Sequence, residues 1–265
     1  MKSDVLLKIH EANTAGKKAA LALIIENKGS TPGEDSSAMA IIEDGETLGT
    51  VGGGKIEADI MRRTMEAFKT NEDFEFDYNL SKSGELQMSC GGNSRGYVKL
   101  FLPRKRLYIF GAGHVGQKLA RVAVKTGFAV DIIDDRSEFK TSPDFAEIDN
   151  YYSDNLSQAI EKLTFDKENT YIILCTRGHS TDLDVLKEVI DKDYKYLGMI
   201  GSRAKVKDVF GKLRELGYSD EDLSSIHTPV GLDIDNGSVE EIAISILAEI
   251  LMVKNNKEGL SLSRN

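Results

Sequence analysis

Cysteine is scarce in this sequence. Its 265 residues include only two cysteines, too few for a disulfide scaffold or a four-cysteine zinc site. Cys175 ends the apolar run Tyr171–Cys175, which predicts a buried strand residue. Cys90 precedes Gly91 and Gly92, which leave its side chain sterically open. We therefore expect Cys90 to be the one cysteine available for chemistry.

Basic charge and long apolar runs are also lacking. Lysine and arginine total 34 against 43 acidic residues, which gives a net charge of −9. Because nucleic-acid affinity comes from basic side chains that displace counterions, we expect no nucleic-acid partner. The longest apolar run, Ala19 to Ile25, is far shorter than the roughly 20 residues of a membrane helix, and the N-terminus lacks a signal-peptide pattern. These absences predict a cytoplasmic protein with no membrane partner.

The sequence divides at the polar junction Pro103–Arg106. This junction separates the alternating segment 97–102 from the apolar segment 107–110. Residues 1–103 are predicted to form a mixed α+β domain. Its expected helices are 4–12 and 54–68, and its expected strands are 20–26, 38–42, 74–78 and 97–102.

Residues 104–254 alternate strands with helices, which is the pattern of a parallel sheet covered on both faces. We therefore expect an α/β protein whose second domain is Rossmann-like and doubly wound, followed by a polar tail at 255–265. Ser238 and Glu241 have the spacing of a capping box before the last helix. The expected strands are 107–110, 129–134, 171–176 and 196–200, and the expected helices are 114–126, 156–163, 182–191, 203–216 and 239–253.

A glycine-rich turn follows the first strand of this second domain. The spacing of Gly111, Gly113 and Gly116 allows a tight turn, close approach of backbone to a diphosphate, and close packing of helix on strand. Asp134 ends the next predicted strand and is placed to accept from ribose hydroxyls, whereas Arg136 would instead favour an additional phosphate. The turn predicts nucleotide binding; the alternative is a doubly wound domain that keeps the turn and binds nothing there.

Histidines and arginines lie in or near the loops that follow the predicted strands. Because ligands of open α/β sheets bind beyond the carboxyl ends of the strands, we expect these side chains to line one crevice. Taken singly, each histidine is better explained by helix capping or packing. Their spacing matches no known metal signature, so a metal role stays undecided. The residues are His114, Arg177, His179, Arg203 and His227.

Three loops of the first domain are rich in glycine. Exposed backbone N–H groups in such loops, especially before a helix, can hold an anion. Ordinary turns and hairpins explain the same glycines equally well. The loops are Lys28–Pro32, Gly52-Gly53-Gly54 and Cys90-Gly91-Gly92.

Together these segments resemble the XdhC/CoxI family, the xanthine dehydrogenase accessory proteins of molybdenum hydroxylases. The resemblance runs nearly end to end and implies a non-catalytic chaperone, which we expect to be a homodimer. Such a protein binds the molybdenum cofactor, as molybdopterin or its dinucleotide form, and protects it while a cysteine desulfurase installs its sulfur. It then delivers the cofactor to an apo molybdenum hydroxylase. The segments are Gly29–Pro32, Gly52–Glu57, Cys90–Gly92, Phe110–Gly116, Thr176–His179, Gly198–Arg203 and His227–Ile234.

The first domain departs from the family pattern at one point. The family usually carries an arginine where this sequence has Gly33, and Gly-Ala where it has Ser36-Ser37. A cation that would meet the pterin phosphate is thereby missing, and Lys28 or Lys55 would have to replace it.

Two other functions remain open from the sequence. One is an NAD(P)-dependent oxidoreductase, for which only His179 or His227 would serve as the acid in hydride transfer. The other is a nucleotide-sensing regulatory module, in which Cys90 would be inert and ligand would bind the second domain alone.

Overall fold

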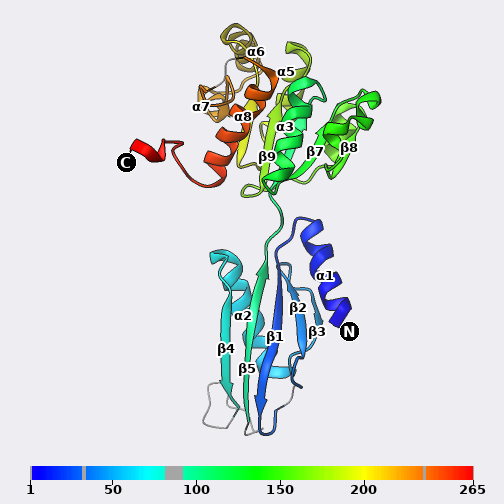
Figure 1. Ribbon diagram of the computed structural model, residues 1–265, viewed down its shortest axis with the longest axis vertical. Coiled ribbons are helices and arrows are strands. Elements are labelled where there is room, and N and C mark those ends of the chain that lie inside the picture. Colours follow the sequence, from blue (N-terminus) through cyan, green and yellow to red (C-terminus); the bar gives the residue numbers. More distant parts are fainter. Residues whose placement is uncertain (1, 32–33, 81–91, 235–236, 265) are drawn as a thin grey trace. The chain divides into compact units, whose positions relative to one another are not determined.

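The computed structural model describes residues 2–31, 34–80, 92–234 and 237–264. The chain divides into two compact units, Met1–Pro103 and Arg104–Asn265 (Figure 1). Each unit has its own buried apolar clusters, and among the described residues no cluster draws buried members from both units. The units are therefore described separately.

The first unit is a five-stranded sheet in the order β3-β2-β1-β5-β4, whose paired strands are antiparallel. This confirms the expected mixed α/β character of the chain. The sequence did not predict β3, which has three exposed residues and so no buried face to reveal it. The elements are α1 (Lys2–Thr14), β1 (Ala19–Lys28), β2 (Ala38–Ile42), β3 (Thr47–Gly49), α2 (Gly54–Thr70), β4 (Phe74–Asn79) and β5 (Asn93–Phe101).

The side chains of β1 alternate between the two faces of this sheet, and apolar side chains are buried on both faces. Ala20, Ala22 and Ile24 join the cluster formed with α2, whereas Ala19 and Leu21 join the cluster formed with α1. Successive side chains of a strand point to opposite faces, so a helix on each face buries both sets. Small alanines let the helices approach the middle of the sheet closely.

The second unit is a six-stranded parallel sheet in the order β11-β10-β9-β6-β7-β8. Numbered along the unit, this is the 3-2-1-4-5-6 order of dinucleotide-binding folds, read from the other edge. The strands are β6 (Arg106–Phe110), β7 (Ala129–Ile133), β8 (Asn150–Tyr152), β9 (Thr170–Leu174), β10 (Tyr196–Met199) and β11 (Ile226–His227).

Helices cover both faces of the second sheet (Figure 1). On one face α3 and α8 pack against the strands, and on the other face α4, α5 and α6 do so. The predicted Rossmann-like fold is thus confirmed, and the central strands β6 and β9 are apolar over residues 107–110 and 171–174 because both of their faces are buried. The helices are α3 (His114–Lys125), α4 (Leu156–Glu161), α5 (His179–Val189), α6 (Arg203–Glu215), α7 (Asp220–Ser224) and α8 (Val239–Lys254).

Short elements and element ends differ from the sequence prediction. β8, β11 and α7 span at most five residues each, too few for a periodic signal. β9 ends at Leu174, so Cys175 is buried just past the strand rather than within it. At the start of α8, Ser238 Oγ accepts from the N–H of Glu241 as the predicted cap requires.

Candidate functional site

The turn between β6 and α3 requires glycine at two of its three predicted positions. Gly111 has a φ of 122°, and a Cβ there would collide with the backbone carbonyl of Cys175. A Cβ at Gly116 would collide with the carbonyl oxygen of Gly111. Gly113 differs, because its φ of −69° suits any residue and no atom lies within 4 Å of its missing Cβ. Gly111 therefore allows the turn to pack against Cys175, and Gly116 allows α3 to pack against the turn. Gly113 leaves the space at the start of α3 open.

In this structure the carboxylate of Asp134, which the sequence placed near ribose hydroxyls, accepts hydrogen bonds from the protein itself. Its Oδ2 accepts from Ala112 N–H at 2.7 Å and from an Arg136 NH2 group at 2.6 Å, and its Oδ1 accepts from the N–H and Nε of Arg136. Burial alone would raise the pKa of Asp134, but these hydrogen bonds lower it. Asp134 thus fixes the glycine turn to the end of β7. Both oxygens of Asp134 and the guanidinium of Arg136 therefore already have partners within the protein.

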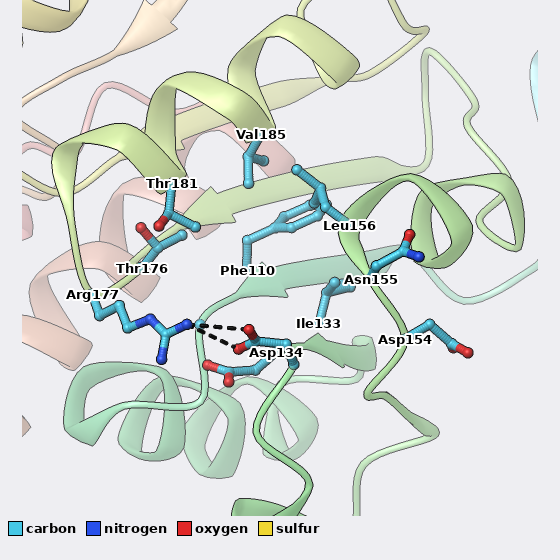
Figure 2. Close-up of a pocket in the computed structure, with 12 residues that line it drawn as sticks. Phe110, Ile133, Asp134, Asp154, Asn155, Leu156, Thr176, Arg177, Thr181 and Val185 are labelled. Carbon is cyan, nitrogen blue, oxygen red and sulfur yellow. Dashed lines mark hydrogen bonds and ion pairs between the residues drawn. The ribbon is translucent and has the colours of Figure 1, made fainter.

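A cavity of about 320 Å³ opens beside this turn, at the carboxyl ends of β6, β7 and β9. Its position is the topological switch point of the sheet, where open α/β folds bind ligands. Apolar side chains form its interior and polar groups surround its mouth (Figure 2). The lining residues are Phe110, Gly111, Ile133, Asp134, Asp135, Asp154, Asn155, Leu156, Thr176, Arg177, Thr181 and Val185.

Arg177 lies at the mouth of the cavity, as the sequence predicted for a crevice residue. Its guanidinium pairs with Asp135 at 3.1 Å, and both side chains are more than half exposed, 58% and 61%. His114 and His179 are the first residues of α3 and α5, at the same edge of the sheet. Arg203 begins α6 after the neighbouring strand β10 and is exposed, but it does not line the cavity.

His227 does not join this crevice. It ends the edge strand β11, three strand spacings from β6, or roughly 14 Å. Its Nδ1 lies 2.6 Å from Oε1 of Glu249 in α8, and its ring packs on Tyr196 with centroids 4.5 Å apart. His227 is not among the residues that line the cavity, because β11 is placed at the sheet edge, and its predicted role in ligand binding stays a prediction.

A buried ion pair supports the loop that carries Arg177. Asp182 of α5 is fully buried, accepts from the hydroxyl of Thr176 at 2.8 Å, and pairs with the ammonium of Lys205 in α6. Lys205 also donates to the carbonyl of Ile200 at 2.9 Å. The pair ties together the loops after β9 and β10. No sequence signal predicts that Asp182 and Lys205 pair with each other.

Sequence reasoning also missed cavity residues that follow β8 and β7. Asp154, Asn155 and Leu156 come after the unpredicted strand β8, and Asp135 was passed over in favour of its neighbour Asp134. The pair Asp154-Asn155 before a predicted helix was the available signal, because Asn155 caps α4 by accepting from Gln158 N–H.

In the first unit, the predicted anion cradle at Gly52–Gly54 already holds a carboxylate from the protein. All three glycines have positive φ, and Oε1 of Glu57 accepts from Gly53 N–H at 2.9 Å and Val51 N–H at 3.0 Å. The hydroxyl of Thr50 donates to the same oxygen at 2.6 Å. Glu57 therefore completes the start of α2, and these two N–H groups are not free for a ligand.

The described residues of the other two glycine loops, 28–31 and Gly92, lie together at one end of the sheet of the first unit. Lys28 of β1 pairs with Asn93 of β5, and Asn93 pairs with Asn79 of β4. A Cβ on Gly92 would lie 2.6 Å from the carbonyl oxygens of Lys28 and Ser30, so glycine is needed for this close contact. Cys90, Gly91 and Gly33 lie outside the described residues, and their predicted roles stay predictions.

The described parts of the chain contain neither a metal cluster nor a membrane span. No three His, Cys, Asp or Glu side chains in these parts are arranged to hold a metal ion. No helix in them has both the length and the apolarity to cross a bilayer.

Comparison with known proteins identifies the family. The profile described as the XdhC Rossmann domain matches residues 107–250, and that of the XdhC and CoxI family matches residues 12–79. The chain belongs to the XdhC family. The family resemblance expected from the motifs is thereby confirmed.

Relatives of this XdhC-family chain include longer proteins. Escherichia coli "Uncharacterized protein YqeB" is 32% identical over 91% of this chain but only 44% of its own length. A protein of Bacillus subtilis named as a probable xanthine dehydrogenase component is 28% identical over 60% of this chain and 46% of its own length. The chain thus spans less than half of these two relatives.

Two further relatives match this XdhC-family chain over most of both lengths. "Molybdenum cofactor insertion chaperone PaoD" of Escherichia coli is 24% identical over 94% of this chain and 87% of its own length. A crystal structure of a Bacillus halodurans xanthine dehydrogenase covers 98% of both chains at 21% identity with a TM-score of 0.52, which supports the fold.

The buried pair generates a stability prediction. Lys205→Met leaves the Asp182 carboxylate buried without its counter-ion, and we expect the free energy of unfolding to fall by about 3–5 kcal/mol. Lys212→Met is the matched control on the same helix, since Lys212 pairs with Asp208 at the surface, and it should cost about 1 kcal/mol or less. Urea unfolding followed by circular dichroism measures both. Equal costs for the two variants would contradict a structural role of the pair.

The His227–Glu249 pair generates a pH prediction. Burial would raise the pKa of Glu249, but hydrogen bonds with His227 and Gly231 N–H lower it, so the folded protein favours the carboxylate. Its stabilisation is therefore present at neutral pH and is lost as the pH falls below about 4.3, the unfolded value, toward the folded pKa. Glu249→Gln should lower stability by about 1.5–3 kcal/mol at pH 7 and by progressively less in acid.

The control for this pH prediction is Glu240→Gln, an exposed carboxylate on the same helix. Unfolding curves between neutral pH and pH about 3 should show a nearly pH-independent difference between Glu240→Gln and the wild type. A pH-independent penalty for Glu249→Gln would instead assign its cost to packing.

Proposed function

We propose that this protein is a molybdenum cofactor chaperone that binds a molybdopterin-type cofactor, protects it and delivers it to an apo molybdenum hydroxylase. Membership of the XdhC family and similarity to a protein named as a cofactor insertion chaperone support this function. The single observation that carries it is the open start of α3 at Gly113 beside a cavity at the switch point.

The second unit fits a phosphate-bearing cargo. Backbone N–H groups at a helix N-terminus attract anions, and at Gly113 no described atom of the protein occupies the adjacent space. Arg177 is exposed after the neighbouring strand β9 and supplies a guanidinium that can bind phosphate by two parallel hydrogen bonds. In this proposal, Gly111 and Gly116 shape the turn, and His114 and His179 are the first residues of α3 and α5 at the same edge of the sheet.

The first unit is proposed to hold the molybdenum end of the cargo. Gly92 contacts Lys28 and Ser30 at one end of its sheet, and Cys90 stands two residues before Gly92 in the sequence. A thiolate there is a soft ligand suited to molybdenum. Lys28 is exposed and pairs with the exposed Glu26 at 3.0 Å, so its ammonium can replace the cation missing at Gly33.

The partners and setting of the proposed function follow from the same interpretation. The chaperone would hold the cofactor while a cysteine desulfurase installs its sulfur, act in the cytoplasm and work as a homodimer. The role needs binding and release of the cargo, and no chemical turnover by this chain.

A second candidate is a nucleotide-sensing module, favoured by the strand order and the cavity of the second unit. An NAD(P)-dependent oxidoreductase is less well supported, because His227 is engaged by Glu249 at the sheet edge and leaves His179 as the remaining acid candidate.

The test of the proposed function is the ligand that the protein carries. Protein purified from a molybdenum-replete host should show a bound pterin mass by native mass spectrometry. Gly113→Val places a side chain in the open space at α3 and should abolish retention without unfolding. Gly211→Val, in an equally open position of α6, is the matched control and should retain it. A nicotinamide mass, or a pterin retained by Gly113→Val, would contradict the proposal.

Cys90 gives a second test. Burial raises the pKa of Cys175 to about 12, so we expect native thiol labelling to modify Cys90 alone. Cys90→Ser should leave the melting temperature unchanged but reduce the retained cofactor, whereas Cys175→Ser should lower stability through a buried hydroxyl. Faster labelling of Cys175, or wild-type cofactor content in Cys90→Ser, would remove Cys90 from the site.

A further inference from the structure

We propose that the cavity at the ends of β6, β7, β8 and β9 binds the nucleoside part of a ribonucleotide, with Asp135 accepting hydrogen bonds from the ribose hydroxyls. The inference rests on the proposed function in one respect: the phosphate of the same ligand lies at the start of α3. It adds that the ligand carries a ribose and a base, as a pterin dinucleotide or a free nucleotide does.

The position of the cavity points to a ribose. In this strand order an acidic residue at the end of the second strand accepts from ribose hydroxyls while phosphates lie at the first helix. Here the second strand is β7, and Asp134 and Asp135 follow it directly. Gly111, at the end of β6, lines the same cavity, so sugar and phosphate positions are adjacent.

Three of the described cavity residues carry a carboxylate, and Asp135 is the most exposed of them. Asp134 is 6% exposed and accepts from Ala112 and Arg136 with both of its oxygens. Asp154 pairs with Lys162 at 2.6 Å. Asp135 is 61% exposed, and its two oxygens accept from the exposed Arg177 at 3.1 and 3.4 Å. Asp135 therefore takes the role that the turn denies to Asp134.

The interior of the cavity suits a flat, largely apolar base. Phe110, Ile133 and Val185 are buried and line it together with Leu156 (Figure 2). Pockets for small molecules combine such apolar walls with a few polar groups that fix orientation. A volume of about 320 Å³ is at the lower end of their usual range and accommodates one nucleoside rather than a whole dinucleotide.

The Arg177–Asp135 ion pair lies across the mouth of the cavity and would exchange partners on binding. Exposed ion pairs of this kind contribute little to stability, so opening this one costs little free energy. Asp135 then accepts from the ribose, and Arg177 is released toward the phosphate. Each charged group thus has a polar partner when the ligand is bound, so neither charge is left unsatisfied in the occupied site.

The experiment uses the full chain and two sets of probes. Calorimetric titration with CDP, GDP and ADP is compared with titration by the 2′,3′-dideoxy form of each. At least one ribonucleotide should bind, and its dideoxy form should bind about 10- to 100-fold more weakly because it lacks the hydroxyls that Asp135 bonds. Asp135→Ala should remove this discrimination. Glu138→Ala, an exposed carboxylate in the same segment, should keep it.

The outcomes separate this inference from the proposed function. Equal binding of ribo and dideoxy forms, discrimination that survives in Asp135→Ala, or no binding of any of the three diphosphates would overturn the inference. Retention of a pterin by the purified protein is measured independently and would still support the chaperone. The mass of the retained species, a pterin dinucleotide or a free nucleotide, identifies the source of the ribose.

Discussion

Two strand ends of the second sheet approach each other so closely that only glycine fits between them. The backbone of Gly111, after β6, lies against the carbonyl of Cys175, after β9, and Gly116 brings α3 down onto the same turn. This contact fixes the directions in which β6, β9 and α3 leave the switch point. The cavity, the open position at Gly113 and the placement of Arg177 all depend on it, because each belongs to a segment that begins there.

Carboxylates of the protein itself hold the loops that surround the candidate sites. Asp134 accepts from Ala112 N–H in the second unit, and Glu57 accepts from Val51 and Gly53 N–H in the first. Buried or half-buried backbone N–H groups need an acceptor, and a nearby side chain supplies one without any ligand. The loops are therefore shaped before any ligand arrives. Preorganisation of this kind lowers the free-energy cost of ordering the loops when a ligand binds.

Two buried carboxylates, Asp182 and Glu249, hold other loops of the second unit in place. The Lys205–Asp182 pair joins the loops after β9 and β10, and the His227–Glu249 pair holds the segment after β11 against α8. None of these four side chains lines the cavity. Both pairs instead fix the direction of loops at the carboxyl edge of the sheet, where the exposed groups Arg177 and Asp135 are left able to change partners.

The sequence by itself determined the two-part α/β architecture, most elements longer than five residues and the glycine turn at Gly111, because periodicity and turn geometry are local properties. It also placed Arg177 correctly beyond a strand end. Only the tertiary structure decided which of the two carboxylates after β7 is exposed beside the cavity. Asp134, the loop Gly52–Gly54 and His227 were each plausible ligand contacts, and each is engaged by a group whose position depends on the folded chain around it. Adjacent residues such as Asp134 and Asp135 look alike in sequence, and their hydrogen-bond partners distinguish them.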